Sequence, residues 1–329
     1  MLAFILRRLV QSVAVLLTVG LVSFFLFRYV GDPINSMVGQ DTPAAEREAL
    51  KEKLGLNDPA PIQFIHFIGN AARGRFGLSY RTSEPVNRLI LERMPATLEL
   101  SLCAALFALF VGVPMGVYTG LYPKHWSSRA LQAVSLIGVS LPTFLIGILL
   151  ILFFSVILHW LPSFGRGETV TIGGWTTNFL RWKGLQALIL PSITLGLFQL
   201  TLIMRLVRSE MLEVMRTDYI KFARARGLTN RAINFGHALK NTLVPVITVA
   251  GLQLGALIAF AIVTETVFAW PGMGQLFIQS VQFADIPVMA AYLMMIGLFF
   301  VIINLAVDLL YFAVDPRLRS QVGARSGAH

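Results

Sequence analysis

The sequence predicts an all-α integral membrane protein with six transmembrane helices, and three observations support this. Hydrophobic residues make up 56% of the 329 residues and charged residues only 13%, whereas roughly a quarter of a soluble domain is charged. Uncharged stretches long enough to cross about 30 Å of hydrocarbon occur six times. Lys and Arg gather between these stretches, so the net charge of +10 indicates membrane topology and contact with anionic lipid rather than binding to nucleic acid.

The six expected spans lie at residues 9–27, 100–122, 130 to about 158, 184–204, 241–264 and 286–307. We interpret the first as a retained span rather than a cleaved signal peptide. Its 19 residues exceed a usual signal core, and no small-residue cleavage site follows. The third is longer than one crossing needs and contains Pro142, so we expect it to tilt or kink.

Both termini should lie on one side of the membrane, because the number of spans is even. The basic segments at 7–8, 124–129 and 205–240 share that side, whereas the short opposite loop at 265–285 has no Lys or Arg. The excess of positive charge predicts that this side is the cytoplasm. The expected parts are a first transmembrane helix (1–30), a small extracytoplasmic segment between the first two helices (31–96), a five-helix core (97–315) with a cytoplasmic loop (205–240), and a cytoplasmic tail (316–329).

The extracytoplasmic segment 31–96 is expected to be folded. Thr42-Pro43 is typical of a helix start and Gly55 of its end, and Asp58-Pro59 offers a second start. This layer could contact a partner or cap a pore, or it could be a lid that only covers the helices. Both interpretations stay open.

Two rows of small residues predict close helix packing. Gly112, Gly116 and Gly120 share one face of the second span, and Gly251 and Gly255 repeat the spacing in the fifth. Without side chains on that face, another helix backbone can approach closely.

The loop 205–240 carries eight Lys and Arg residues. Leu212, Met215, Tyr219 and Phe222 have the spacing of one apolar stripe on a helix. Gly227 suits the residue that stops this helix, and Thr229 can cap a new one. The stripe could dock into a hydrophobic cleft of another protein, or the helix could lie on anionic lipid; the glycine corner favours docking.

Polar residues within or beside the spans are few. Gln199 and Gln253 are expected to line a path, because they sit deep and need a polar neighbour. Glu99 and Glu265 lie near outer ends, where they can reach water or the outer layer, and Asp308 could pair with Arg317 or Arg319. Trp270 suits an aromatic anchor at the membrane surface; the sharper alternative places it, with Glu265, in an outer gate.

The chain carries no pattern typical of an enzyme. It has no phosphate-binding Gly-x-x-x-x-Gly-Lys-Ser/Thr loop, and its five histidines lack metal-ligand spacing. Cys103 is the single cysteine, which excludes an intrachain disulfide. Ser140 follows Gly138-Val139 but has no partnered base in view. We therefore expect no catalytic, cofactor-binding or metal-binding residue in this chain.

Longer motifs carry a family resemblance. The loop reads Asp218-Tyr-Ile-x-x-Ala-Arg-Ala-x-Gly-Leu228 and then His237-Ala-Leu-x-Asn-x-x-x-Pro245. Further motifs are the opening Met-Leu-x-Phe-Ile-Leu-Arg-Arg, Gly31-Asp-Pro33, Ala96-Thr-Leu-Glu-Leu100, Thr264-Glu-Thr-Val-Phe268, Trp270-Pro-Gly-Met-Gly274 and Asp315-Pro-Arg317. The chain resembles the B-subunit type of the dipeptide, oligopeptide and nickel family of ABC-importer permeases. It departs from the general Glu-Ala-Ala motif of such permeases, because Lys221 and Phe222 replace its first two residues.

The resemblance implies a type I importer permease in the bacterial inner membrane that forms half of a pathway for di- or oligopeptides. Its partners would be a second permease, two ATPase subunits that bind ATP and Mg, and an external solute-binding protein. The residues implied in ATPase coupling are Leu212, Met215, Asp218, Tyr219, Phe222, Ala223, Arg224, Ala225 and Gly227. Nickel or a small solute such as glutathione is an alternative cargo, and a non-transporting receptor or scaffold is an alternative of another class.

Overall fold

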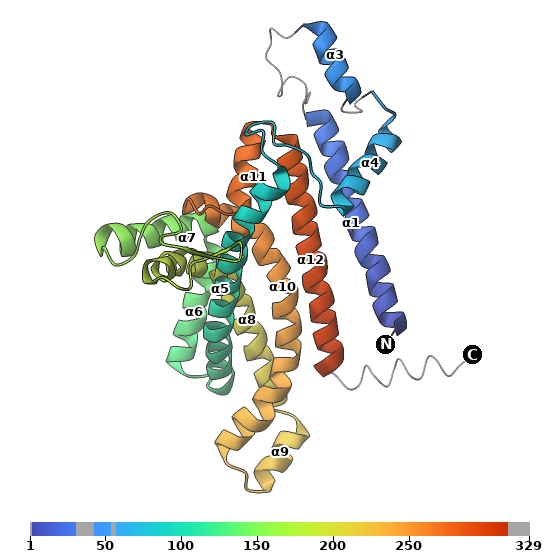
Figure 1. The fold of residues 1–329 in the computed structure, drawn as a ribbon. Helices are drawn as coiled ribbons and strands as arrows, with labels where there is room; N and C mark the ends of the chain where they lie inside the picture. The colour runs from blue at the N-terminus through green and yellow to red at the C-terminus, as the bar shows by residue number, and fades with distance from the viewer. Residues whose placement is uncertain (1, 31–42, 54–56, 315–329) are drawn as a thin grey trace, which may run out of the picture.

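The computed structural model describes residues 2–30, 43–53 and 57–314, and this part of the chain is mostly helical. Five of its helices are long and apolar enough to cross a membrane, or six if one sharply bent pair counts as a single span. The five long helices are α1 (Leu2–Val30), α5 (Val86–Leu121), α8 (Trp182–Val214), α10 (Leu239–Val267, preceded by the π-helix η2, Ala232–Ala238) and α12 (Ile286–Val314). Figure 1 shows them running side by side as an elongated bundle.

The third expected span is a broken helix. It consists of α6 (Trp126–Ser140), then α7 (Thr143–Leu150) and the π-helix η1 (Ile151–Ile157), with a bend of 111° between the two parts. The break lies at Leu141-Pro142, where Leu141 has an extended backbone (φ −102°, ψ 141°), as the residue before a proline prefers. The expected kink is confirmed at this proline, but its size turns the second part almost sideways (Figure 1).

Helices α5 and α8 form the central pair. A Cβ atom added at Gly116 would lie 2.6 Å from the Cβ atom of Val207, and one at Gly120 would lie 2.7 Å from that of Met211. Gly112 faces the backbone oxygen of Leu200 in the same way, at 3.0 Å. The glycine row therefore lies along the contact with α8, where a side chain would force the helices apart.

Helix α10 lies against both α8 and α12. Its glycines face the second of these neighbours: Gly251 lies against Val307, and a Cβ atom at Gly255 would lie 2.7 Å from the ring of Phe300. Helix α1 packs along α12 at the edge of the bundle. Arg8 of α1 donates to Asp308 of α12 at 2.8 Å. Arg317 and Arg319, which were expected to pair with Asp308, lie outside the described residues.

Two short helices, α3 (Ala44–Lys53) and α4 (Ala60–Ala72), follow α1 in the segment 31–96. They begin directly after Pro43 and Pro59, as the sequence predicts. Thr42 and Gly55, which were expected to flank the first, lie outside the described residues. The two helices lie beside the far end of α1, at the end of the molecule opposite α9 (Asp218–Ala225) (Figure 1).

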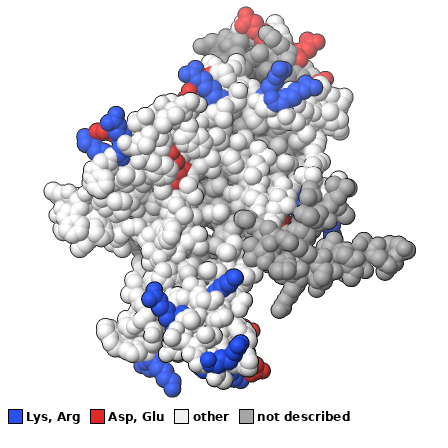
Figure 2. Space-filling model, turned by 60° about the horizontal axis from the view of Figure 1, so that its bottom comes forward, with Lys and Arg blue, Asp and Glu red and all other residues white. Residues whose placement is uncertain are grey.

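Charged side chains gather at the two ends of the molecule. In Figure 2, Lys and Arg surround the protruding end that carries α9 and others lie at the opposite end. The broad belt between them is white except for an acidic side chain, and no Lys or Arg is visible on its white surface. The first residues of α1 and the last turn of α12 lie toward the end that carries α9 (Figure 1). This is the surface of a protein whose middle is immersed in hydrocarbon.

Candidate functional site

The most prominent feature is a corner that projects beyond the bundle (Figure 1). Helix α8 ends at Val214, residues 215–217 form a turn, α9 runs from Asp218 to Ala225, and η2 leads back into α10. The sequence predicted one continuous helix carrying a single apolar stripe from Leu212 to Phe222. That prediction is wrong, because the turn interrupts the helix and resets the direction in which side chains point.

The buried face of α9 is formed by other residues. Ile220 is fully buried and Ala223 nearly so, in one cluster with Met211 of α8 and Ile233 of η2. Ile220 was missed, although its spacing of three from Ala223 is itself a helical signal once the helix is started at Asp218. The cluster ties the corner to both helices from which it projects.

The end of α9 has the predicted glycine stop. Gly227 has φ 77°, its N–H donates to the carbonyl oxygen of Arg224 at 2.9 Å, and the N–H of Leu228 donates to that of Ala223 at 3.3 Å. This pair of bonds is the Schellman motif. The next helix is capped as expected, because the N–H of Ala232 donates to Thr229 Oγ1 at 3.3 Å.

The outer face of the corner is aromatic and basic. Phe222 is 63% exposed and Tyr219 42%, and the guanidinium of Arg226 lies 5.5 Å from the ring centre of Phe222. Tyr219 also accepts a hydrogen bond at 2.8 Å from Asn241 of α10. Of the other residues implied in coupling, Asp218, Arg224, Ala225 and Gly227 are exposed, and Leu212 and Met215 are half-buried. A large aromatic ring left in water beside cations is typical of a surface that a protein partner covers.

A second feature is a pocket of about 240 Å³ between α7, α8 and α10. Gln199 of α8 and Gln253 of α10, which the sequence predicts to line a path, both line this pocket. Gln199 is 4% exposed, and its Nε2 has no hydrogen-bond partner among the described residues. The remaining lining residues are Thr143, Leu195, Phe198, Ala256, Leu257, Phe260 and Val263.

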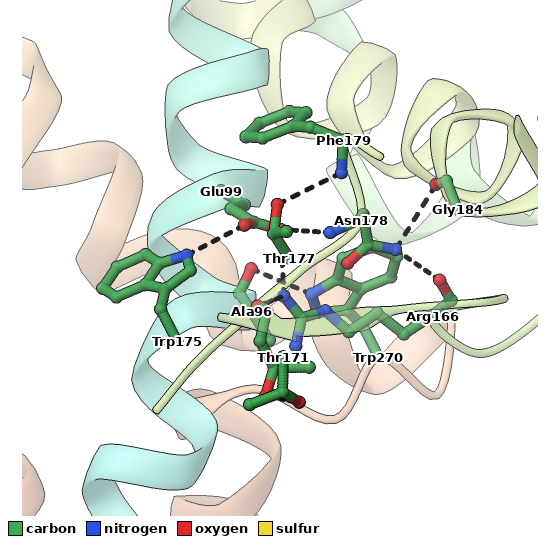
Figure 3. Close-up of polar contacts among 11 residues, drawn as sticks. Ala96, Glu99, Arg166, Thr171, Trp175, Thr177, Asn178, Phe179, Gly184 and Trp270 are labelled. Atoms are coloured by element: carbon green, nitrogen blue, oxygen red, sulfur yellow. Dashed lines mark hydrogen bonds and ion pairs between the residues drawn. The ribbon is translucent and has the colours of Figure 1, made fainter. Parts of the chain in front are cut away.

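A third feature is a buried ion pair between Glu99, in the N-terminal half of α5, and Arg166 (Figure 3). Arg166 donates to Glu99 at 2.9 Å and to the carbonyl oxygen of Thr176 at 2.6 Å. Glu99 also accepts from the indole N–H of Trp175 and from the backbone N–H of Asn178, both at 3.1 Å. Burial lowers the pKa of the Arg166 guanidinium, and the neighbouring carboxylate of Glu99 opposes this shift.

This ion pair fastens the loop between η1 and α8 to the bundle. The loop contains a hairpin of β1 (Val170–Ile172) and β2 (Trp175–Thr177), whose two-residue turn is Gly173-Gly174 with φ 56° and 85°. Positive φ at both residues is the type I′ geometry that glycine allows. Glu99 was expected to reach either water or the segment 31–96, and both alternatives are wrong, because the carboxylate is buried and its partners belong to this loop.

Glu265 and Trp270 bond to the same half of α5, and both are fully enclosed. Glu265 accepts from Thr97 of α5 at 2.5 Å and from the backbone N–H of Gln275 at 2.9 Å, in α11 (Met273–Gln282). The indole of Trp270 donates to the carbonyl oxygen of Ala96 at 3.0 Å. The expectation of an interfacial Trp270 is therefore wrong, because its ring fills the core where α5, α10 and α11 meet and its N–H has an acceptor there.

No group of three His, Cys, Asp or Glu side chains that could hold a metal ion occurs within residues 2–30, 43–53 and 57–314. The structure thus offers a projecting corner, a pocket, and a loop between η1 and α8 that is fastened to the bundle.

Comparison with known families decides the class. The family of the binding-protein-dependent transport system inner membrane component matches residues 112–320, and the N-terminal membrane component of such systems matches residues 1–101. The chain belongs to this family. It is therefore a multi-pass protein of the bacterial inner membrane and a permease subunit by family.

The permease is similar to known proteins over nearly its whole length. The di/tripeptide transport system permease protein DppB of Pseudomonas aeruginosa is 40% identical, over 98% of this chain and all of the relative. The dipeptide transport system permease protein DppB of Alkalihalophilus pseudofirmus is 36% identical, over 97% and 100%. The oligopeptide transport system permease protein AppB of Bacillus subtilis is 38% identical, over 97% and 99%.

The fold of the permease is that of a type I ABC importer. A chain of the MetNI methionine ABC transporter in an inward-facing conformation aligns with a TM-score of 0.54 at 22% identity, over 69% of this permease and 96% of that chain. A second crystal form of the same transporter gives 0.55.

Proposed function

We propose that this permease is one of two that together form the path of an ATP-driven peptide importer. The support for peptide as cargo is that the relatives, similar over nearly their whole length, are named for dipeptides, di/tripeptides and oligopeptides. The partners in this proposal are a second homologous permease, two ATPase subunits that bind ATP and Mg, and an extracytoplasmic solute-binding protein. The chain itself performs no catalysis.

The observation that carries the proposal is the projecting corner with its exposed Phe222. In the proposed orientation both termini and α9 are cytoplasmic, which agrees with the basic charge at that end (Figure 2). The ATPase then receives the outer face of α9, including Tyr219, Phe222 and Arg224. Glu265 and Trp270 hold the external end of α5, α10 and α11 together as a unit.

Movement of the ATPase would reach the path through contacts already described. The cluster of Ile220, Met211 and Ile233 couples α9 to α8 and to the start of α10, and Tyr219 bonds Asn241 directly. A displacement of α9 therefore moves α8 and α10 together, and these are the helices that carry Gln199 and Gln253. Rigid-body motion of this kind is one way to open the path alternately to the two sides.

The experiment is ATP-driven peptide uptake into liposomes that contain the complete importer and its binding protein. Phe222→Asp places a charge where an apolar cleft should receive the ring, and buried aromatic anchors contribute at least about 2 kcal/mol to such interfaces. We expect at least about tenfold weaker ATPase binding and slower uptake, with normal insertion of the permease.

Phe222→Leu is the matched control, because it keeps an apolar side chain at the same exposed position, and it should retain most of the uptake. Normal ATPase association and normal uptake by Phe222→Asp would refute the coupling role. Absence of ATP-driven accumulation by the unmodified complex, with any peptide offered, would favour a receptor or scaffold without transport.

A further inference from the structure

The pocket between α7, α8 and α10 has the composition of a site for a neutral polar group. Its walls are mostly apolar side chains, and its polar side chains are Thr143 and the two amides of Gln199 and Gln253. No charged side chain lines it. An apolar pocket with a few converging polar groups is the usual form of a small-molecule site.

The hydrogen bonding of Gln199 indicates that this pocket binds a ligand. The side chain is 4% exposed, yet its Nε2 donates to nothing among the described residues. Burying a hydrogen-bond donor without an acceptor destabilises the folded state. A glutamine at this position is explained if a ligand from outside the chain supplies the acceptor. A lipid tail supplies no acceptor and would leave the amide as unsatisfied as before.

The size and the opening of the pocket limit what the acceptor can be. About 240 Å³ is below the roughly 300–1,000 Å³ of a site that encloses a whole small molecule, so the pocket holds part of a larger solute. Its rim includes Phe198 and Phe260, which are 44% and 68% exposed, so it opens on the surface of the bundle. The uncharged lining disfavours an ammonium or carboxylate terminus of a solute.

We infer that Gln199 and Gln253 form a subsite that hydrogen-bonds a backbone amide of the peptide in transit. A glutamine amide offers both a donor and an acceptor, and a peptide group presents the complementary acceptor and donor whatever its side chains are. The subsite recognises the peptide bond itself, and the apolar walls accept the adjoining side chain. This inference rests on the proposed transport of peptides and adds the group that is recognised within the path.

The test compares a peptide with its depsipeptide, in which an ester replaces the amide. The ester lacks the N–H donor and has a weaker carbonyl acceptor. In liposomes containing the complete importer, we expect the unmodified permease to take up the peptide about two- to tenfold faster than the depsipeptide, the range that one hydrogen bond supplies. Because every variant is measured with the same binding protein, the preference of that protein cancels when variants are compared.

Gln199→Met and Gln253→Met remove the amides and keep the length of the side chain. Each should slow peptide uptake and leave depsipeptide uptake nearly unchanged, so that the ratio falls toward one. Gln199→Met should also unfold at the same or a higher temperature, because it removes an unsatisfied buried donor. The matched control is Gln132→Met in α6, whose Nε2 donates to the carbonyl oxygen of Ser128 and which lies outside the pocket; its ratio should stay that of the unmodified permease.

Each other outcome overturns the inference or the proposal on which it rests. An unchanged peptide-to-depsipeptide ratio in both pocket variants, with peptide accumulation intact, refutes the subsite and leaves peptide transport standing. Loss of the second permease on purification of either variant means that the pocket is a contact between subunits. No accumulation of any peptide by the unmodified complex refutes the proposed function itself.

Discussion

The buried pair of Glu99 and Arg166 allows a sharp test of how the loop between η1 and α8 is held to the bundle. Arg166→Met removes the cation and leaves Glu99, which is 3% exposed, with only the donors of Trp175 and Asn178. Glu99→Gln removes the anion and leaves Arg166, which is 9% exposed, beside a neutral amide and the carbonyl oxygen of Thr176. Each single variant therefore leaves one buried charge without its counter-ion.

The magnitude follows from what each variant leaves behind. Removal of one partner from a buried ion pair typically costs about 3–5 kcal/mol, because the remaining charge has lost its solvent and its counter-ion. Replacement of both partners by neutral residues is often neutral or stabilising. The double variant should therefore be more stable than either single variant, with a large coupling energy between the two sites.

The assay is equilibrium unfolding of the four proteins in detergent micelles by added SDS, combined with limited trypsin digestion. Because the pair fastens the loop between η1 and α8, part of the loss should appear as local opening and faster cleavage at the exposed Arg181. Additive effects within about 0.5 kcal/mol would show that the two charges do not depend on each other. Unchanged cleavage at Arg181 in both single variants would show that the pair does not hold the loop.

Three further results are expected. Gly116→Ala should destabilise the permease by about 1–3 kcal/mol in the same unfolding assay, because the added Cβ atom meets Val207. The control Gly69→Ala should be tolerated, because no atom lies within 4 Å of its Cβ position. Gly227→Val should destabilise the corner by about 1–2 kcal/mol through its positive φ alone, which faster proteolysis of residues 226–229 would report. Burial, and to a smaller extent the charge of Asp285, raises the pKa of Tyr80 from 10.0 to about 12. The stability that neutral Tyr80 contributes should therefore be full below about pH 10 and be lost as the pH rises towards 12. Unfolding measured across that range should lose this pH dependence in Tyr80→Phe.

The features that could be predicted from the sequence depend on neighbours along the chain. The starts of α3 and α4 follow from Pro43 and Pro59, because a proline fixes its own φ and suits the first position of a helix. The end of α9 follows from Gly227, because a left-handed residue is needed there. The break in the third span follows from Pro142, although its angle of 111° depends on packing that no local pattern contains.

The features that could not be predicted depend on residues far apart in the chain. Glu99 and Arg166 are separated by 67 positions, and the indole of Trp270 finds its acceptor at Ala96, 174 positions away. The stripe through the corner failed for another reason. A helical period was extended across a turn at residues 215–217, and a few non-helical residues are enough to exchange the buried and exposed faces, so that Ile220 is enclosed and Phe222 is left in water.

The four residues proposed for a path or gate show where sequence reasoning reaches its limit. All four were singled out because polar or amphipathic side chains in or beside a span need a partner. The oxygens of Glu265 are occupied by Thr97 and Gln275, and the N–H of Trp270 by a carbonyl oxygen; such groups can hold helices together without any solute. Gln199 differs because its donor is buried and unsatisfied within the described residues, and because the residue lines a pocket together with Gln253. The sequence identifies which polar side chains in a span require a hydrogen-bond partner. Only the structure shows that Glu265 and Trp270 have partners within the chain, whereas the donor of Gln199 has none among the described residues and is available to a solute.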